Sequence, residues 1–326
     1  MQQRREQGHP EARRVMLNLF YSPRYVCSGY EFDTTRKAKW IADSLIKSHI
    51  PGVVLTEPSP ATHAQLALVH DVNYIRAVQT GEPRKLSESQ GFTWGPEVWQ
   101  LVRATNGGVL AAVASALKHG VAGSLSSGLH HARRESGEGF CTFNGLAMAA
   151  RVALSAGARS VLILDLDAHF GGGTQSLVAD DPRIWQVDVS TSDFDRYLPS
   201  ERAWPCLVRD PSDYLPTIER CLDKLDQYAP RFDLCLYNAG MDPHEHCPMG
   251  GLCGITRETL DEREQLIFDW CAERRLPVAF VIAGGYIGRH LDEQGLTNLH
   301  RLTIGSAARL EGTFRSSERL ETGKIK

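Results

Sequence analysis

The chain has 326 residues, of which 42% are hydrophobic and 23% are charged, and its formal net charge is −3. This composition supports a sizeable buried core, and the near-neutral charge excludes a broad basic surface for nucleic acid. No apolar run approaches the roughly eighteen residues of a membrane span, and the charged N-terminus lacks the apolar segment of a secretory signal. Because its eight cysteines also show no disulfide framework, we expect a cytoplasmic protein with neither a nucleic-acid nor a membrane partner.

The pattern of elements predicts one α/β domain. In chain order, short β-branched or aliphatic runs predict strands at residues 15–20, 53–55, 124–127, 160–165, 184–189, 234–237 and 278–282. Helical patterns lie between them at residues 35–47, 96–118, 144–155, 214–228 and 257–274, and Gly107-Gly108 is expected to divide the second. This alternation predicts an open parallel sheet with helices on both faces. The domain should span residues 15–311, between flexible tails at 1–14 and 312–326.

Polar segments follow four of the predicted strands. They read GLHHARRESGEGF from Gly128, DLDAHFGGGT from Asp165, NAGMDPHEHCPMGG from Asn238 and AGGYIG from Ala283. In an open parallel sheet, ligands bind beyond the carboxyl ends of the strands. We therefore expect these segments to converge on one site.

Three residues of these segments are candidate metal ligands. Asp167 and His169 stand two residues apart at a strand end, so their side chains point to the same side. Carboxylate oxygen and imidazole nitrogen suit a divalent metal, and Asp242 would add a third ligand while leaving a position open for water and substrate. The alternative is that these aspartates only cap a helix or begin a turn.

Two further motifs are candidates for catalysis. The adjacent His130 and His131 follow Gly128 in a polar loop, where both rings can turn toward one point. Tyr286 lies beyond two glycines, which lets a phenol reach over a site and donate its proton to a developing oxyanion. The alternatives are structurally satisfied histidines and an ordinary Gly-Gly-Tyr loop.

Taken together, these motifs resemble the histone deacetylase family, including its bacterial acetylpolyamine and acetoin-utilisation relatives and its class IV branch. The match covers most of the chain, from LFYSPRY and FDTTRKAKWIADSL through LVHDVNYI to the AGGY segment. The resemblance implies a zinc-dependent deacetylase or deacylase. It would use metal-activated water to hydrolyse the amide of an acyl-lysine, an acetylpolyamine or a related acylated amine.

The resemblance also implies roles for individual residues. Asp167, His169 and Asp242 would hold one Zn²⁺ per chain, a metal that lowers the pKa of bound water to about 7. In the catalytic machinery, His130 and His131 would be general base and acid, Tyr286 would bind the scissile carbonyl and then the oxyanion, and Asp165 would orient the first histidine. A structural K⁺ or Na⁺ is expected near Asp165, and Phe140 and Met249 are assigned to the substrate channel.

The chain departs from the family pattern at Gly172. The family has Asp or Asn here, three residues after the zinc-binding histidine, as the partner of the second histidine. We therefore expect His131 to lack a carboxylate unless another acidic group or water intervenes, to be the more readily neutral of the two histidines, and to act as general base, with His130 mainly electrostatic. Cys247 replaces a frequent Asp and should shape a loop, and His244 and His246 are expected at the pocket rim or in solvent.

Two other functions compete with this interpretation. An arginase-like ureohydrolase shares the fold but binds two manganese ions, and this chain has Gly171 and His244 where such enzymes carry further aspartates. A binding protein that recognises acylated ligands without cleaving them is the other alternative. Metal stoichiometry distinguishes the first and turnover the second. The sequence does not choose among the acylated amines, and residues 81–95 are expected to form part of the rim that does.

Overall fold

The computed structural model describes the backbone of residues 16–26 and 33–322, with side chains described up to Leu310 apart from those of residues 33 and 34. The strands are β1 (Leu17–Phe20), β2 (Val53–Thr56), β3 (Val121–Ser124), β4 (Val161–Asp165), β5 (Ile184–Ser190), β6 (Ala203–Leu207), β7 (Leu234–Gly240) and β8 (Val278–Ala283). They form one parallel sheet in the order β2-β1-β3-β8-β7-β4-β5-β6. The predicted α/β fold with an open parallel sheet is confirmed.

Ten helices occur in the described part of the chain. They are α1 (Asp33–Lys47), α2 (His63–Leu66), α3 (Val72–Thr80), α4 (Arg84–Ser87), α5 (Val98–His119), α6 (Gly145–Ser155), α7 (Gly172–Val178), α8 (Tyr214–Tyr228), α9 (Arg257–Glu273) and α10 (Glu293–Thr322). Two 3-10 turns, η1 (Pro23–Tyr25) and η2 (Pro211–Asp213), complete the elements. None of these helices combines the length and apolar character needed to cross a membrane.

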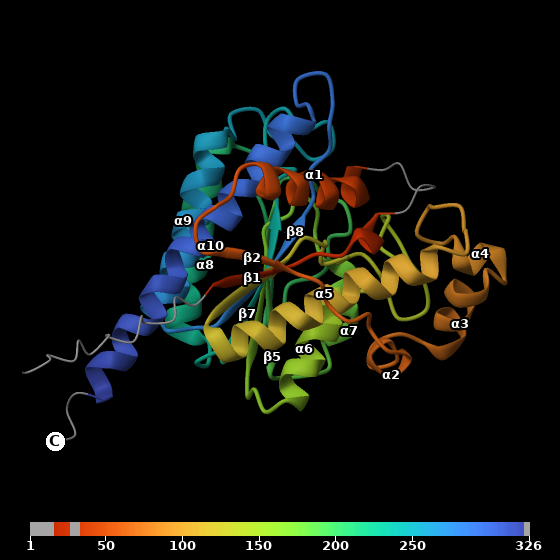
Figure 1. Ribbon diagram of the computed structural model, residues 1–326, viewed down its shortest axis with the longest axis horizontal. Coiled ribbons are helices and arrows are strands. Elements are labelled where there is room, and N and C mark those ends of the chain that lie inside the picture. Colours follow the sequence, from red (N-terminus) through yellow and green to blue (C-terminus); the bar gives the residue numbers. More distant parts are fainter. Residues whose placement is uncertain (1–15, 27–32, 323–326) are drawn as a thin grey trace, which may run out of the picture.

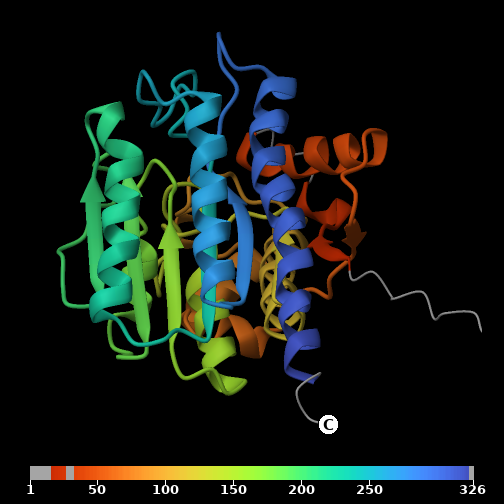
Figure 2. The ribbon, with the colours of Figure 1, turned by 90° about the vertical axis from the view of Figure 1, so that its left-hand side faces the viewer.

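Helices cover both faces of the sheet because alternate residues of each strand point to opposite sides. In β4, Leu162 and Leu164 join the core beneath α8, α9 and α10, whereas Val161 and Ile163 join the core beneath α5 and α6. Figure 1 shows the two helical layers on either side of the sheet, and Figure 2 shows α8, α9 and α10 side by side over one face.

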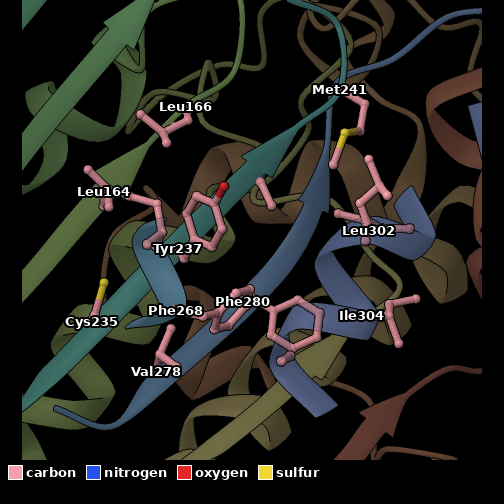
Figure 3. Close-up of a cluster of buried hydrophobic side chains, with 14 of the residues drawn as sticks. Leu164, Leu166, Cys235, Tyr237, Met241, Phe268, Val278, Phe280, Leu302 and Ile304 are labelled. Atoms are coloured by element: carbon pink, nitrogen blue, oxygen red, sulfur yellow. The ribbon is translucent and has the colours of Figure 1, made fainter. Parts of the chain in front are cut away.

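The core on the α9 and α10 side reaches the carboxyl edge of the sheet. Tyr237 of β7 and Phe280 of β8 pack with Phe268 of α9, with ring centroids 5.9 Å and 5.8 Å from the Phe268 ring. Figure 3 shows that the cluster extends to Met241, the residue before the candidate ligand Asp242. The candidate ligand is thus anchored by close-packed apolar side chains.

The Gly107-Gly108 pair does not divide its helix, and this expectation is wrong. Helix α5 runs unbroken through both residues. A Cβ atom at residue 107 would lie 2.1 Å from the Ser59 carbonyl oxygen, and one at residue 108 would lie 1.8 Å from the Tyr25 hydroxyl oxygen. The glycines therefore serve close packing of α5 against its neighbours, at some cost in helix propensity.

Other boundaries also differ from those predicted. Strand β3 begins and ends three residues earlier than predicted, and β6, the short helices α2, α3, α4 and α7, and the C-terminal helix α10 were not predicted. The backbone of α10 continues through residue 312, where a flexible tail was expected to begin. The expected N-terminal tail, residues 1–14, lies outside the described residues.

Candidate active site

The four polar segments converge because their strands are neighbours. Strands β3, β8, β7 and β4 are consecutive in the sheet and parallel, so their carboxyl ends meet at one edge. Asp165, which ends β4, pairs in register with Asn238 of β7. The carboxyl ends of these strands and the loops after them carry every candidate metal and catalytic residue.

Asp167, His169 and Asp242 form a compact cluster of possible metal ligands. One ligand atom from each lies within 4.8 Å of the others. His169 Nδ1 is 3.1 Å from Asp167 Oδ1 and 3.2 Å from Asp242 Oδ2. Ala168 N donates to Asp242 Oδ1, whereas the buried Asp242 Oδ2 faces His169 Nδ1. Two buried carboxylates that converge on one imidazole fit a bound divalent cation.

The protonation of the cluster supports the same interpretation. Burial opposes a charge on His169, but hydrogen bonds with Asp167 and Asp242 outweigh it and raise its pKa to about 10. Burial and the neighbouring charge of Asp167 raise the pKa of Asp242 to about 6. Two buried carboxylates around one imidazole thus attract positive charge strongly, and a metal dication would compete with protons for the same atoms.

His130 is held by the strand-end carboxylate that the sequence predicted. Its Nδ1 donates to Asp165 Oδ2 at 2.8 Å, while Asp165 Oδ1 accepts from Asn238 Nδ2 at 2.8 Å and from Asp167 N at 3.1 Å. Burial lowers the pKa of His130, but the charges of Asp165 and Asp167 outweigh this and raise it to about 10. His130 is therefore cationic in this environment.

His131 has a carboxylate partner, so the alternative that another acidic group intervenes is the one observed. Its Nδ1 donates at 2.9 Å to Oδ2 of Asp195, in the loop between β5 and β6. Burial and the charge of His130 nevertheless lower the pKa of His131 to about 4, against the opposing effect of Asp195. His131 is the more readily neutral histidine, as expected, but because of burial and its charged neighbour rather than a missing carboxylate.

Tyr286 follows a glycine turn that closes over the ligands. Gly285 has φ +108°, a conformation that favours glycine, and Lys37 Nζ donates to the carbonyl oxygens of Ala283 at 2.8 Å and Gly284 at 2.7 Å. Burial, followed by the charges of Asp242 and Asp167, raises the pKa of Tyr286 well above its usual value. The phenol stays protonated and is a hydrogen-bond donor beside the cluster.

Aromatic side chains lie around the histidines. The Phe194 ring meets the rings of His131 and His169 edge to face, with centroids 4.9 Å and 5.9 Å away. The ring centroids of Phe140 and Phe92 lie 5.2 Å apart. Phe92 belongs to residues 81–95, the segment expected to form part of the rim. Met249 is 38% exposed and precedes Gly250, where an added Cβ would lie 3.2 Å from His169 Cε1.

Sequence reasoning missed Phe194 and Asp195. Both follow β5, the neighbour of β4 in the sheet, whose carboxyl end was not among the four segments expected to form the site. The segment TSDFDRY after that strand carried the signal. Applying the strand-end rule to β5 would have made both residues candidates, although it would not have identified their partner.

The remaining sequence expectations concern the loop after β7. Cys247 is buried, and its Sγ donates to the Met249 carbonyl oxygen at 3.3 Å, within the loop it was expected to shape. His244 is only 7% exposed, while the His246 side chain is 48% exposed. Their rings lie 5.3 Å apart. Neither belongs to a group of metal-ligating residues within the described chain.

A parallel α/β sheet with a buried Asp-His-Asp cluster, paired histidines and a tyrosine at its carboxyl edge has the features of a hydrolase with a possible metal site. The family model described as the histone deacetylase domain matches residues 32–205, just over half of the chain. The chain belongs to the histone deacetylase family. This membership gives it the function of a deacetylase-type amide hydrolase.

Individual relatives agree with this assignment. An uncharacterized protein of Picosynechococcus sp. is 35% identical over 243 residues, which cover 71% of this chain and 78% of the relative. Histone deacetylase 2 of Arabidopsis thaliana is 25% identical over 292 residues, covering 83% and 75%. The crystal structure of an acetylpolyamine aminohydrolase from Burkholderia pseudomallei has the same fold, with a TM-score of 0.73, 21% identity and coverage of 90% and 99%.

Proposed function

We propose that this chain is a zinc-dependent deacylase that hydrolyses the amide of an acylated amine, with one Zn²⁺ held by Asp167, His169 and Asp242. The observation that carries the proposal is the gathering of these three ligand atoms within 4.8 Å of one another. The burial of both carboxylates adds support, since buried charges ordinarily are paired or bind metals. Three protein ligands of this kind also leave the fourth tetrahedral position for water or substrate.

The side chains around the cluster suit amide hydrolysis. Zinc bound there would supply a water of pKa about 7 and polarise the scissile carbonyl. His131, neutral and protonated at Nδ1, would take the proton that the attacking water loses and pass it to the leaving amine. His130, held cationic by Asp165, would stabilise the negative charge that develops, and the Tyr286 hydroxyl would donate to the oxyanion.

The walls of the site favour an amine that carries an aliphatic stem. Phe140, Phe194 and Met249 offer apolar surfaces on which the methylenes of a lysine or a polyamine would pack. The solved structure with the same fold is named as an acetylpolyamine aminohydrolase, and the proposed substrates are an acyl-lysine, an acetylpolyamine or a related acylated amine.

A structural K⁺ or Na⁺ near Asp165 forms part of the proposal. Asp165 and Asp188 are both fully buried, and burial followed by the charge of Asp165 raises the pKa of Asp188 well above its usual value. Gln186 Oε1 and Ser190 Oγ are buried without a hydrogen-bond partner among the described residues. Carbonyl, hydroxyl and carboxylate oxygens are the donors that such a cation takes. Replacing K⁺ with choline should lower the melting temperature.

Hydrolysis of a substrate panel tests the proposed function. Zinc-loaded protein should release free amine and carboxylate from acetyl-lysine peptides, longer acyl-lysines or acetylpolyamines, and a hydroxamate should inhibit it. Asp242→Asn serves as the variant without function and His49→Asn, at an exposed position, as the matched control. Release of urea from a guanidine substrate would favour the arginase-like alternative. Zinc-dependent binding of the acylated amines without turnover would favour the binding protein.

A further inference from the structure

The carboxylate that holds His131 occupies the space where a side chain at position 172 would lie. A Cβ added to Gly172 would be 2.3 Å from the Asp195 carbonyl oxygen and 2.4 Å from Asp195 Oδ1. Gly172 is the first residue of α7, whereas Asp195 comes from the loop between β5 and β6. The glycine that breaks the family pattern thus provides the room that Asp195 fills.

Asp195 is held in place by contacts on both of its carboxylate oxygens. Oδ2 accepts from His131 Nδ1 at 2.9 Å and from Gly173 N at 3.0 Å, and Oδ1 forms an ion pair with Arg133. Arg133 is fixed in turn, because its Nε donates to Glu138 Oε2 at 2.8 Å. The Asp195 side chain is only 3% exposed.

The backbone of this loop also bears on the role of Asp195. Asp195 has φ +57°, a left-handed conformation that is uncommon for a residue with a side chain. Such a conformation persists only where surrounding contacts over-determine it, and it clusters at functional sites. The contacts with His131, Gly173 and Arg133 are of this kind.

We propose that Asp195 is a positioning residue for the hydrolytic reaction and that it takes over the role of the carboxylate missing at position 172. This inference rests on the proposed function. By accepting a hydrogen bond from Nδ1–H, Asp195 fixes the tautomer of His131, so that Nε2 carries the lone pair that receives a proton from the attacking water. Arg133 keeps the carboxylate in the orientation that His131 requires.

Removing the carboxylate at position 195 tests this inference. Asp195→Gly should lower kcat about 10- to 100-fold, as for other groups that orient a ligand or base, with KM within about twofold and zinc retained. Glycine also adopts the φ of residue 195 without strain. Gly172→Asp should lower kcat as well, because its Cβ would lie 2.3 Å from the carbonyl oxygen of residue 195 and 2.4 Å from Asp195 Oδ1.

A conservative variant and a matched control guard against misfolding. Asp195→Asn keeps the shape of the side chain but removes its charge and should lower kcat in the same direction. Asp193→Asn, two residues earlier in the same loop and paired with Arg196 and Arg209, should leave kcat within about twofold. Wild-type kcat in a folded, zinc-loaded Asp195→Asn would overturn the proposal.

A spectroscopic readout separates this inference from the proposed function. Nitrogen-15 NMR of the histidine side chains should show His131 protonated at Nδ1 and bare at Nε2 in the zinc-loaded wild type. Asp195→Asn should shift His131 toward the other tautomer and leave His130 unchanged. If no acylated amine is hydrolysed, the proposed function is wrong. The His131 tautomer in Asp195→Asn then decides by itself whether Asp195 orients His131. An unchanged His131 tautomer in Asp195→Asn contradicts it.

Discussion

His130 and His131 are neighbours in the chain, but their carboxylate partners come from regions that are built in different ways. Asp165 ends β4, a strand paired on both sides, and hydrogen bonds from Asn238 and from the backbone of Asp167 fix its second oxygen. Asp195 stands in a loop at φ +57° and is fixed by Arg133 and the backbone of Gly173. One partner is set by sheet register and the other by side-chain contacts.

Because the two carboxylates are held differently, they should serve two functions: Asp165 supports the candidate metal cluster as well as a histidine, and Asp195 supports a histidine alone. Asp165 is two residues from the metal-cluster residue Asp167, so a change at Asp165 disturbs the cluster and the histidine together. Within the described residues, Asp195 forms no hydrogen bond or ion pair with Asp167 or Asp242. Its loss should therefore affect proton transfer alone. Variants in the two regions should therefore differ in metal content as well as in rate.

The largest effect on activity is expected from replacing the proposed metal ligands, on which the function of both regions depends. Replacing Asp167, His169 or Asp242 with Ala should abolish turnover and strongly reduce bound zinc, because metal catalysis contributes several kcal/mol to lowering the barrier. Activity and zinc content measured on the same preparations check this. His49→Ala, at an exposed position, is the control. Stoichiometric zinc in all three variants would contradict the ligand assignment.

Tyr286→Phe should have the next largest effect. It keeps the ring but removes the donor to the oxyanion, and loss of one such donor costs about 2.7–4 kcal/mol of barrier. The decrease should be in kcat, with KM and zinc content nearly unchanged. Steady-state kinetics on a zinc-loaded variant measure it, and near-normal turnover would mean that another group stabilises the oxyanion.

Asp165→Asn and Asp195→Asn compare the two carboxylates directly. Each should lower kcat, by about 10- to 100-fold for a group that orients a neighbouring base. Asp165→Asn should have the larger effect and should also lower zinc affinity, because Asp165 accepts a hydrogen bond from the backbone of Asp167. Equal zinc affinity and equal rates in the two variants would remove the distinction between the regions.

The smallest effect concerns His70, which supports the segment after β3 that carries Arg133, the ion-pair partner of Asp195. Its Nδ1 donates to the carbonyl oxygen of Arg133 and its Nε2 accepts from Asn144 N, both at 2.8 Å. Burial is the main cause that lowers the pKa of His70 to about 4 from a usual value near 6.5. As the pH falls below 6.5, His70 binds a proton in the unfolded chain but not in the folded chain, so the free energy of unfolding decreases. This loss should be about 2 kcal/mol between pH 7 and pH 5.

Urea unfolding at both pH values checks this effect. Other buried histidines such as His131 and His300 change stability in the same direction, so the comparison must be between variants. His70→Asn should be less stable than wild type at pH 7 but should lose about 2 kcal/mol less on acidification. His49→Asn should keep the wild-type slope. A wild-type slope in His70→Asn would show that His70 does not titrate in this way.

Much of the fold follows from local patterns in the sequence. Buried parallel strands such as β4 are continuous apolar runs, and helices such as α8 have an apolar face, so both were predicted nearly to the residue. Strand β7 begins where predicted but continues three residues further, through Asn238, Ala239 and Gly240. Strand β6 was missed because AWPCL is short and contains a proline, which is typical of an edge strand. The unbroken α5 depends on contacts with Ser59 and Tyr25 that lie far away in the sequence.

The residues of the site also divide into those that local sequence motifs predict and those that depend on the folded chain. The candidate ligands, the paired histidines and Tyr286 occupy strand ends in short motifs, so residue type and spacing were enough to select them. The partner of His131 was not predictable, because Asp195 is 64 residues away from it along the chain and replaces a residue expected at position 172. Only the folded loop between β5 and β6 reveals that substitution.

Titrating zinc into metal-depleted protein, while following hydrolysis of an acylated amine, tests whether one zinc ion per chain is catalytic. If Asp167, His169 and Asp242 hold a single catalytic zinc, activity should rise linearly and reach its plateau at one zinc per chain. The same titration of Asp242→Asn should give little activity at any ratio. A plateau that requires two metal ions per chain, or turnover that is unaffected by removing and restoring zinc, would contradict the account.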